Sequence, residues 1–234
     1  EAMIAINEKT YKIVTIPEVA ADNNVITDST YLKLGDGVVT GSVLQQHKGY
    51  PAWDIAYMNM HTSREEDRAK AVKAITARGS DRYIQNKYDI AVADIPAKDA
   101  TISADFTINN YAQVTGKQCF VNMNLCRTFE NKRIDTKDRT VPSYTDYKSK
   151  KKEVVVLEIP KGYKVSYLPK PAKGSVPGLW SYNISYKADK NKITLTKEYE
   201  VNTRSIASAK FADNNKMVDD LRKIYKESVV LTTN

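Results

Sequence analysis

The sequence has few of the residues that form metal and cofactor sites. Its 234 residues include two Cys, two His and nine Gly. A structural zinc site needs four ligands, usually Cys or His at close spacing. The Cys and His side chains form no C-x-x-C or H-x-x-x-H pair; they are Cys119, Cys126, His47 and His61. The chain also has no P-loop and no G-x-G-x-x-G motif. We therefore expect no metal site and no cofactor.

Long hydrophobic runs are also missing. A membrane-spanning helix needs a run of about 18 or more apolar residues, and no such run occurs in this sequence. The chain begins Glu1-Ala2-Met3, without an initiator Met and without the apolar region of a signal peptide. We predict no membrane span, and we interpret the sequence as a fragment or a processed product.

The composition is that of a folded globular chain with a basic surface. Hydrophobic residues make up 41% and charged residues 27%, and the formal net charge is +8. The one dense basic run covers 148–152, which we interpret as a solvated loop before a strand. Elsewhere basic and acidic residues are mixed, whereas nucleic-acid modules gather Arg and aromatic residues on one face. We therefore expect no nucleic-acid partner.

Most of the chain has the pattern of short β-strands. Apolar residues alternate with polar ones from Ile102 to Ile108, which predicts a strand with one buried face. Asp36-Gly37 predicts a hairpin turn, because both residues tolerate positive φ. The predicted strands are 11–16, 30–34, 38–44, 52–58, 88–92, 101–111, 119–123, 153–159, 163–168, 179–186, 192–201 and 229–232.

Two segments have helical spacing. Ser63 and Glu66 form a capping-box pattern, and Gly79 is placed to end a helix over 63–78. The segment 214–226 carries Met217, Leu221 and Ile224 on one face, with 213–215 as its cap. The sequence therefore predicts a mainly β fold, as one or more antiparallel β-sandwiches with two α-helices, 63–78 and 214–226. We place a domain boundary near Pro96, which gives a β-rich domain over 1–97 with one inserted helix and a β-sandwich domain over 98–234 with a C-terminal helix.

Three segments carry a resemblance to a known family. Residues 153–169 read EVVVLEIPKGYKVSYLP, residues 34–41 read LGDGVVTG, and residues 216–231 end in a strand after a helical pattern. In this order they resemble the C-terminal domain of unknown function that follows the transglutaminase-like core in large bacterial envelope proteins. The resemblance implies a periplasmic or cell-surface location and a core upstream with a Cys-His-Asp site. It gives this chain structural residues, such as Pro160, Gly162 and Tyr163, and no catalytic ones.

The two Cys allow three interpretations: a disulfide, a nucleophile site, or two buried and unpaired side chains. A disulfide between Cys119 and Cys126 requires a chain reversal, because an extended segment of this length separates the α-carbons by roughly 23 Å. A cysteine-nucleophile site with His47 or His61 remains a third hypothesis, although neither Cys begins a helix. We favour two buried, unpaired Cys side chains, and we predict no catalytic residues in this chain.

An aromatic platform is the remaining site candidate. Trp180 and Tyr182 follow a Gly- and Pro-rich loop over 171–178, and loops often carry binding residues. We name these two residues as candidate ligand-binding residues, with core packing as the alternative.

The functional prediction follows from the resemblance and the absent reactive motifs. We expect a non-catalytic accessory region that packs on or orients a transglutaminase-like core, or that contacts another envelope protein. The alternative is an independent binding module for cell-wall glycan, peptide or protein.

Overall fold

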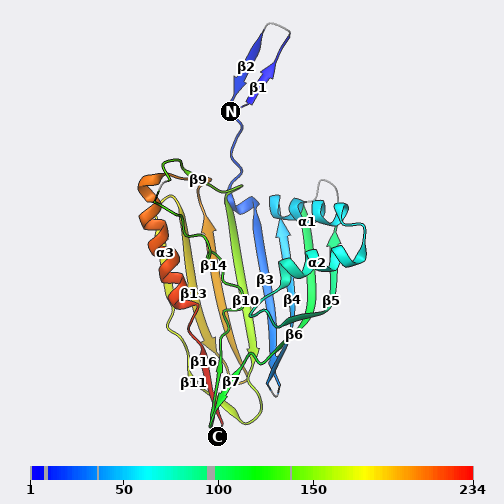
Figure 1. Cartoon of the computed structure of the whole chain (residues 1–234), viewed down its shortest axis with the longest axis vertical. Coiled ribbons are helices and arrows are strands. Elements are labelled where there is room, and N and C mark those ends of the chain that lie inside the picture. Colours follow the sequence, from blue (N-terminus) through cyan, green and yellow to red (C-terminus); the bar gives the residue numbers. More distant parts are fainter. Residues whose placement is uncertain (1, 8–9, 36, 94–97, 138, 234) are drawn as a thin grey trace.

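The computed structural model describes residues 2–7, 10–35, 37–93, 98–137 and 139–233. Its main feature is an eight-stranded sheet in the order β12-β13-β14-β10-β3-β4-β6-β5 (Figure 1). The strands are β3 (Val25–Leu34), β4 (Val38–Lys48), β5 (Tyr83–Val92), β6 (Asp99–Asn109), β10 (Ser149–Glu158), β12 (Ala172–Val176), β13 (Trp180–Ala188) and β14 (Lys192–Val201). Most neighbouring strands are antiparallel, but β3 and β10 pair in parallel at the centre of the sheet.

One face of the large sheet is covered and the other is open to solvent. Along β6, Ala100, Ile102, Ala104, Phe106 and Ile108 are buried, while the residues between them are partly or fully exposed. This is the strict alternation that a one-sided sheet requires. On the open face, Leu44 of β4 is 43% exposed.

A second sheet and a helix cover one half of that face. The four-stranded sheet has the order β11-β16-β8-β7, with β7 (Gln113–Thr115), β8 (Gln118–Val121), β11 (Tyr163–Tyr167) and β16 (Val229–Thr233). Helix α3 (Phe211–Ile224) lies beside it, next to β13 (Figure 1). Val121 and Leu231 of the small sheet share one buried cluster with Leu157 and Leu195 of the large sheet. The prediction of a mainly β fold with large, antiparallel-rich sheets is confirmed, and the arrangement of the two sheets is sandwich-like.

Two helices cover the other half, where one was expected. Residues 52–58, predicted as a strand, belong to helix α1 (Tyr50–His61). The apparent alternation of Trp53, Ile55 and Tyr57 was misleading, because the buried residues Ala52, Ile55 and Ala56 follow helical spacing instead. Pro51 stands in the first turn, where its missing N–H costs nothing. The described chain thus contains three α-helices rather than two.

The other two helices were predicted, but their starts differ. Helix α2 (Glu65–Thr76) begins after Arg64, and no side-chain hydrogen bond caps it, so the expected capping box is absent. Gly79 does adopt a positive φ of 78°, three residues beyond the helix. Helix α3 begins at Phe211, so the residues expected as its cap lie inside its first turns. Asn214 and Asn215 are buried there.

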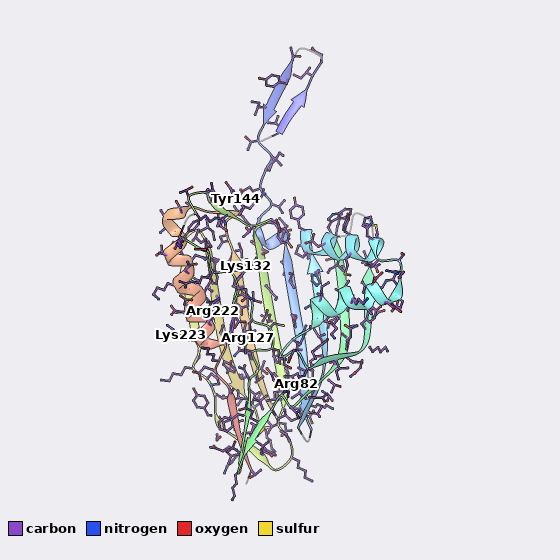
Figure 2. The ribbon with its side chains drawn as sticks, viewed as in Figure 1. Arg82, Arg127, Lys132, Tyr144, Arg222 and Lys223 are labelled. Carbon is purple, nitrogen blue, oxygen red and sulfur yellow. The ribbon has the colours of Figure 1, made fainter. Side chains whose placement is uncertain are left out.

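The basic run also differs from the expectation of a solvated loop. Residues 149–152 belong to the central strand β10, and Lys150 and Lys152 form ion pairs with neighbouring segments. Lys150 contacts Glu200 at 3.6 Å and Lys152 contacts Glu198 at 3.1 Å, both on the adjacent strand β14. Further basic residues beside α3 are mixed with acids in the same way. Figure 2 shows Arg127 and Arg222 near each other, and both bond to Glu130.

The remaining elements are short. A hairpin of β1 (Ala2–Ala5) and β2 (Tyr11–Val14) projects from the body (Figure 1), and β9 (Ser143–Tyr144) pairs with β15 (Ser205–Ile206). Two 3-10 turns, η1 (Ala21–Asn23) and η2 (Ser208–Lys210), precede β3 and α3.

The boundary predicted near residue 97 lies outside the described residues. The strands that flank it, β5 and β6, are hydrogen-bonded neighbours, and the large sheet takes strands from both predicted domains. None of the helices in the described part of the chain has the length and hydropathy needed to cross a lipid bilayer.

Candidate functional site

Three charged residues and one glutamine form a row across the covered face of the large sheet. Lys197 of β14, Glu153 of β10, Asp28 of β3 and Gln45 of β4 are successive cross-strand neighbours. All four side chains are buried. They lie side by side because each occupies an inward position of its own strand in this register.

The buried charges of this row neutralise one another. Lys197 Nζ lies 2.5 Å from Glu153 Oε2, and both side chains are at most 1% exposed. Arg78 donates from two guanidinium nitrogens to the Asp28 carboxylate, at 3.0 and 3.2 Å. Burial alone would raise the pKa of Glu153, but the charges of Lys197 and Lys151 outweigh it and lower the pKa to about 2. Such a network holds the sheet and its covering loops in one arrangement, since a lone buried charge would be strongly unfavourable.

His47 and Cys126 lie in or near this buried region, whereas Cys119 is on β8 of the small sheet. His47 is buried on β4, and its Nε2 lies 3.2 Å from Gln45 Oε1. Burial, aided by the charge of Lys151, lowers the pKa of His47 to about 4. Cys119 and Cys126 are free cysteines, and burial raises the pKa of both thiols. Among the described residues, no hydrogen bond joins either Cys to a His, and His61 is exposed at the end of α1.

The predicted ligand-binding pair lies in the core. Trp180 is buried, donates from Nε1 to Asn214 Oδ1 at 3.0 Å, and packs against Phe129 with ring centroids 4.8 Å apart. Tyr182 is buried beside Gly174, where a Cβ would lie 2.4 Å from the Tyr182 ring. These contacts are the ones expected if Trp180 and Tyr182 pack in the core, which was the alternative interpretation. A ligand-binding role for the pair stays a prediction. Trp180 also borders a small cavity of about 110 Å³.

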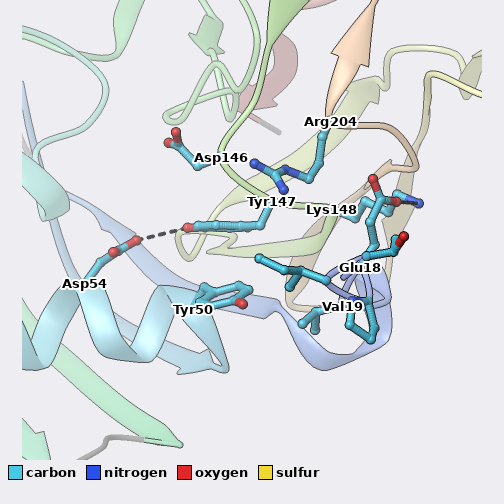
Figure 3. Close-up of a pocket in the computed structure, with 11 residues that line it drawn as sticks. Glu18, Val19, Tyr50, Asp54, Asp146, Tyr147, Lys148 and Arg204 are labelled. Atoms are coloured by element: carbon cyan, nitrogen blue, oxygen red, sulfur yellow. Dashed lines mark hydrogen bonds and ion pairs between the residues drawn. The ribbon is translucent and has the colours of Figure 1, made fainter. Parts of the chain in front are cut away.

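A larger cavity lies elsewhere, at the end of the sheet near the start of α1. It has a volume of about 880 Å³, and we call it the Tyr147 cleft (Figure 3). Four segments far apart in the sequence line it: residues 15–19, the first turn of α1, the segment before β10, and the link after β14. The lining residues are Thr15, Ile16, Pro17, Glu18, Val19, Tyr50, Asp54, Asp146, Tyr147, Lys148 and Arg204.

A buried amide joins two walls of this cleft. The Asn24 side chain accepts from the Tyr50 backbone N–H at 3.0 Å and donates to the Lys148 carbonyl at 2.9 Å. Asn24 is 1% exposed, so neither bond competes freely with water. Gly49 makes the close approach possible: its φ is 72°, and a Cβ there would lie 2.0 Å from the Asn23 carbonyl oxygen. The amide therefore fixes the start of α1 relative to the start of β10.

Tyrosines and charged groups face one another inside the cleft. The Tyr147 hydroxyl donates to Asp54 Oδ2 at 3.1 Å, and its ring stacks on Tyr50 with centroids 5.6 Å apart. In Figure 3, Tyr50 and Arg204 lie on opposite sides of Tyr147. Burial, together with the carboxylates of Asp54 and Asp146, raises the pKa of Tyr147 well above its usual value, so its hydroxyl stays protonated. The cleft thus offers aromatic surface, hydrogen bonding and charges of both signs.

Helix α1 continues this surface outside the cleft. Tyr50, Trp53 and Tyr57 are 48%, 38% and 54% exposed, and Met60 extends the same stripe by one more turn. We call these four residues the aromatic face of α1. They share one side because they recur at helical spacing, while Ala52, Ile55 and Ala56 occupy the buried side. Exposed aromatic residues in a continuous patch indicate an interaction surface.

Sequence reasoning did not find this site. The available signal was in residues 50–61: Pro51 at a helix start and aromatic residues three and four positions apart. Treating 52–58 as a strand placed Trp53 and Tyr57 on one face with the buried Ile55, and it left Tyr50 and Met60 outside the element. The other walls come from polar connections with no periodic signal.

Within the described ranges, no group of three or more His, Cys, Asp or Glu is placed to hold a metal ion.

Part of the chain matches the model of a known protein family. Residues 117–231 match the family model described as "Domain of Unknown Function with solved-structure structure (DUF3858)". The match contains β8, α3 and the first part of β16, and it includes the segments 153–169 and 216–231 noted in the sequence. No curated protein matches the chain in a sequence comparison. The family description names no activity, ligand or partner.

Proposed function

We propose that this chain is a non-catalytic accessory region of a transglutaminase-like cell-envelope protein, and that it packs on or orients the core of that protein. The match of residues 117–231 agrees with the domain of unknown function that the resemblance led us to expect. The buried charge network supports a non-catalytic role, because Lys197, Glu153 and Arg78 serve as internal contacts. The accompanying location is the periplasm or the cell surface.

The aromatic face of α1 is the observation that carries the proposal. Surface helices of soluble proteins usually turn charged residues outward, but the outward side of α1 shows Tyr50, Trp53, Tyr57 and Met60. Asp54 is the one carboxylate on this helix. Tyr and Trp contribute most to protein–protein affinity, because they bury large rigid surfaces at low entropic cost. This face therefore fits a folded protein surface such as the expected core.

Direct binding of the chain to a separately expressed transglutaminase-like core tests the proposal. We expect a complex by calorimetry, and we expect Trp53→Glu and Tyr57→Glu each to weaken it at least about tenfold. Leu44→Glu is the matched control, since Leu44 is similarly exposed but lies on the open face of the sheet. Absence of a complex contradicts the proposal, and equal weakening by all three substitutions contradicts the assigned surface.

An independent binding module for cell-wall glycan, peptide or protein is the second candidate. The Tyr147 cleft favours it, because stacked tyrosines beside carboxylates and a guanidinium suit a polar ligand. Pull-down on insoluble peptidoglycan and a titration followed by Trp fluorescence test this candidate. A flat response across glycans and peptides would remove it.

A further inference from the structure

The Tyr147 cleft is lined in part by charged side chains that, unlike several charged residues nearby, belong to no ion pair within the described part of the chain. On the adjoining sheet, Lys150 contacts Asp22 at 2.5 Å and Lys152 contacts Glu198 at 3.1 Å. Within the cleft, Lys148 is likewise paired with Glu18 at 2.5 Å. Among the residues that the structure describes, no ion pair involves Asp54, Asp146 or Arg204. These three side chains nevertheless line one cavity.

The three charges are arranged around the Tyr147 ring. Asp54 accepts the Tyr147 hydroxyl proton in a hydrogen bond of 3.1 Å, and the Asp146 carboxylate acts on the same hydroxyl electrostatically. Arg204 extends over the other side of the ring from Tyr50 (Figure 3). The cleft thus has two carboxylates near the Tyr147 hydroxyl, a guanidinium above the ring, and an apolar wall made by Tyr50 and Tyr147.

We propose that the Tyr147 cleft binds a short peptide that carries both a free ammonium group and a carboxylate. The ammonium group pairs with Asp54 and Asp146, and the peptide carboxylate pairs with Arg204, whose planar guanidinium suits that group. The aliphatic part of the peptide lies along the Tyr50 and Tyr147 rings. A neutral glycan brings no charge to pair with Asp54, Asp146 and Arg204, so the charge pattern favours the peptide.

The volume and the lining are consistent with this ligand class. Small-molecule sites are commonly clefts of about 300 to 1,000 Å³ with a few placed polar groups, and this cleft measures about 880 Å³. The buried Asn24 amide holds two of its walls together, so that part of the site is formed before a ligand arrives. Preformed walls reduce the entropic cost of binding.

The test is a titration of the whole chain with the tripeptide alanyl-lysyl-alanine, which has free termini. Trp53, which precedes Asp54 on α1, serves as the fluorescent reporter, and calorimetry gives the dissociation constant. We expect saturable binding that weakens with added salt, because exposed ion pairs are screened. Replacing the lysine with norleucine and acetylating the N-terminus, or amidating the C-terminus, should weaken binding at least about threefold.

Three substitutions and a control locate the binding. Asp146→Asn and Arg204→Gln should each raise the dissociation constant at least about threefold, and Asp54→Asn with Asp146→Asn together at least about tenfold. Asp146 and Arg204 are exposed, so their substitution leaves the fold intact. Asp81→Asn, an exposed carboxylate in the turn before β5, should bind like the unaltered chain.

Several results would overturn the proposal: no saturation at roughly 10 mM peptide, binding that ignores Asp146→Asn and Arg204→Gln, or tighter binding of N-acetylglucosamine oligomers than of the peptide. The proposal does not depend on docking to a core. The peptide titration uses this chain alone, so it can fail while the core still binds, and the reverse also holds.

Discussion

Acid should destabilise the folded chain through His47. Burial, with the charge of Lys151, lowers the pKa of this imidazole from 6.5 to about 4, while Asp28 partly opposes the shift. Between these two values the unfolded state binds a proton that the folded state excludes, so the free energy of unfolding decreases as the pH falls. Above about pH 6.5 both states are neutral at this residue, and the effect disappears.

The size of this effect follows from the two pKa values. A full shift from 6.5 to about 4 corresponds to about 3 kcal/mol, at about 1.4 kcal/mol per pH unit. Between pH 7 and pH 5 the unfolded state takes up most of one proton, so we expect a loss of about 2 kcal/mol. That is a large part of the 5 to 15 kcal/mol that usually separates folded from unfolded domains.

Urea denaturation at pH 7, 6 and 5 measures this loss, with the fluorescence of the buried Trp180 as the signal. Other groups also titrate in acid, so the informative quantity is the difference between the unaltered chain and His47→Gln. The variant should lose about 2 kcal/mol of the pH dependence. His61→Gln is the matched control, because His61 is exposed, and it should keep the original slope. If His47→Gln shows the same slope as the unaltered chain, the reasoning about the buried imidazole is refuted.

Three further outcomes are expected. Glu153→Gln should destabilise the chain by about 3 to 5 kcal/mol in urea denaturation, because it leaves Lys197 buried without a counter-charge; the exposed Glu158→Gln, its control on the open face, should change stability by less than about 1 kcal/mol. Asn24→Ala should cost about 2 to 4 kcal/mol, since it removes two buried hydrogen bonds, and an unchanged urea midpoint would contradict the role given to this amide. Iodoacetamide should label Cys119 and Cys126 rapidly only after denaturation, as followed by mass spectrometry, and fast labelling of either thiol in the folded chain would contradict its raised pKa.

Local signals in the sequence predicted most of the sheet strands. β14 spans 192–201, as expected, because a long alternating segment follows a clear turn. Strand β6 was found from the alternation of Ile102 to Ile108, and the final helix from apolar residues at helical spacing. In each case one side of the element is buried against the core, which imposes the period directly on the sequence.

Long-range contacts account for the errors. Residues 52–58 satisfied both a strand pattern and a helix pattern, and the helix forms because Ile55 packs into a buried cluster with Ile102 of β6. The segment with Lys150 and Lys152 was predicted as a solvated loop. In the structure these lysines face Glu200 and Glu198 of β14 as cross-strand partners. Asn214 and Asn215 resembled a helix cap, but they bond to Trp180 and to the Ile134 backbone across the fold.

The amino-acid order alone determined the β-rich class, the positions of most strands and the C-terminal helix, because those follow from periods of two or three to four residues. Only the tertiary structure placed Asn24, Tyr50 and Tyr147 together at the end of the sheet, and only it set Lys197, Glu153 and Asp28 in one row. Both arrangements depend on the register between strands distant in sequence, and no short-range pattern of residues encodes that register.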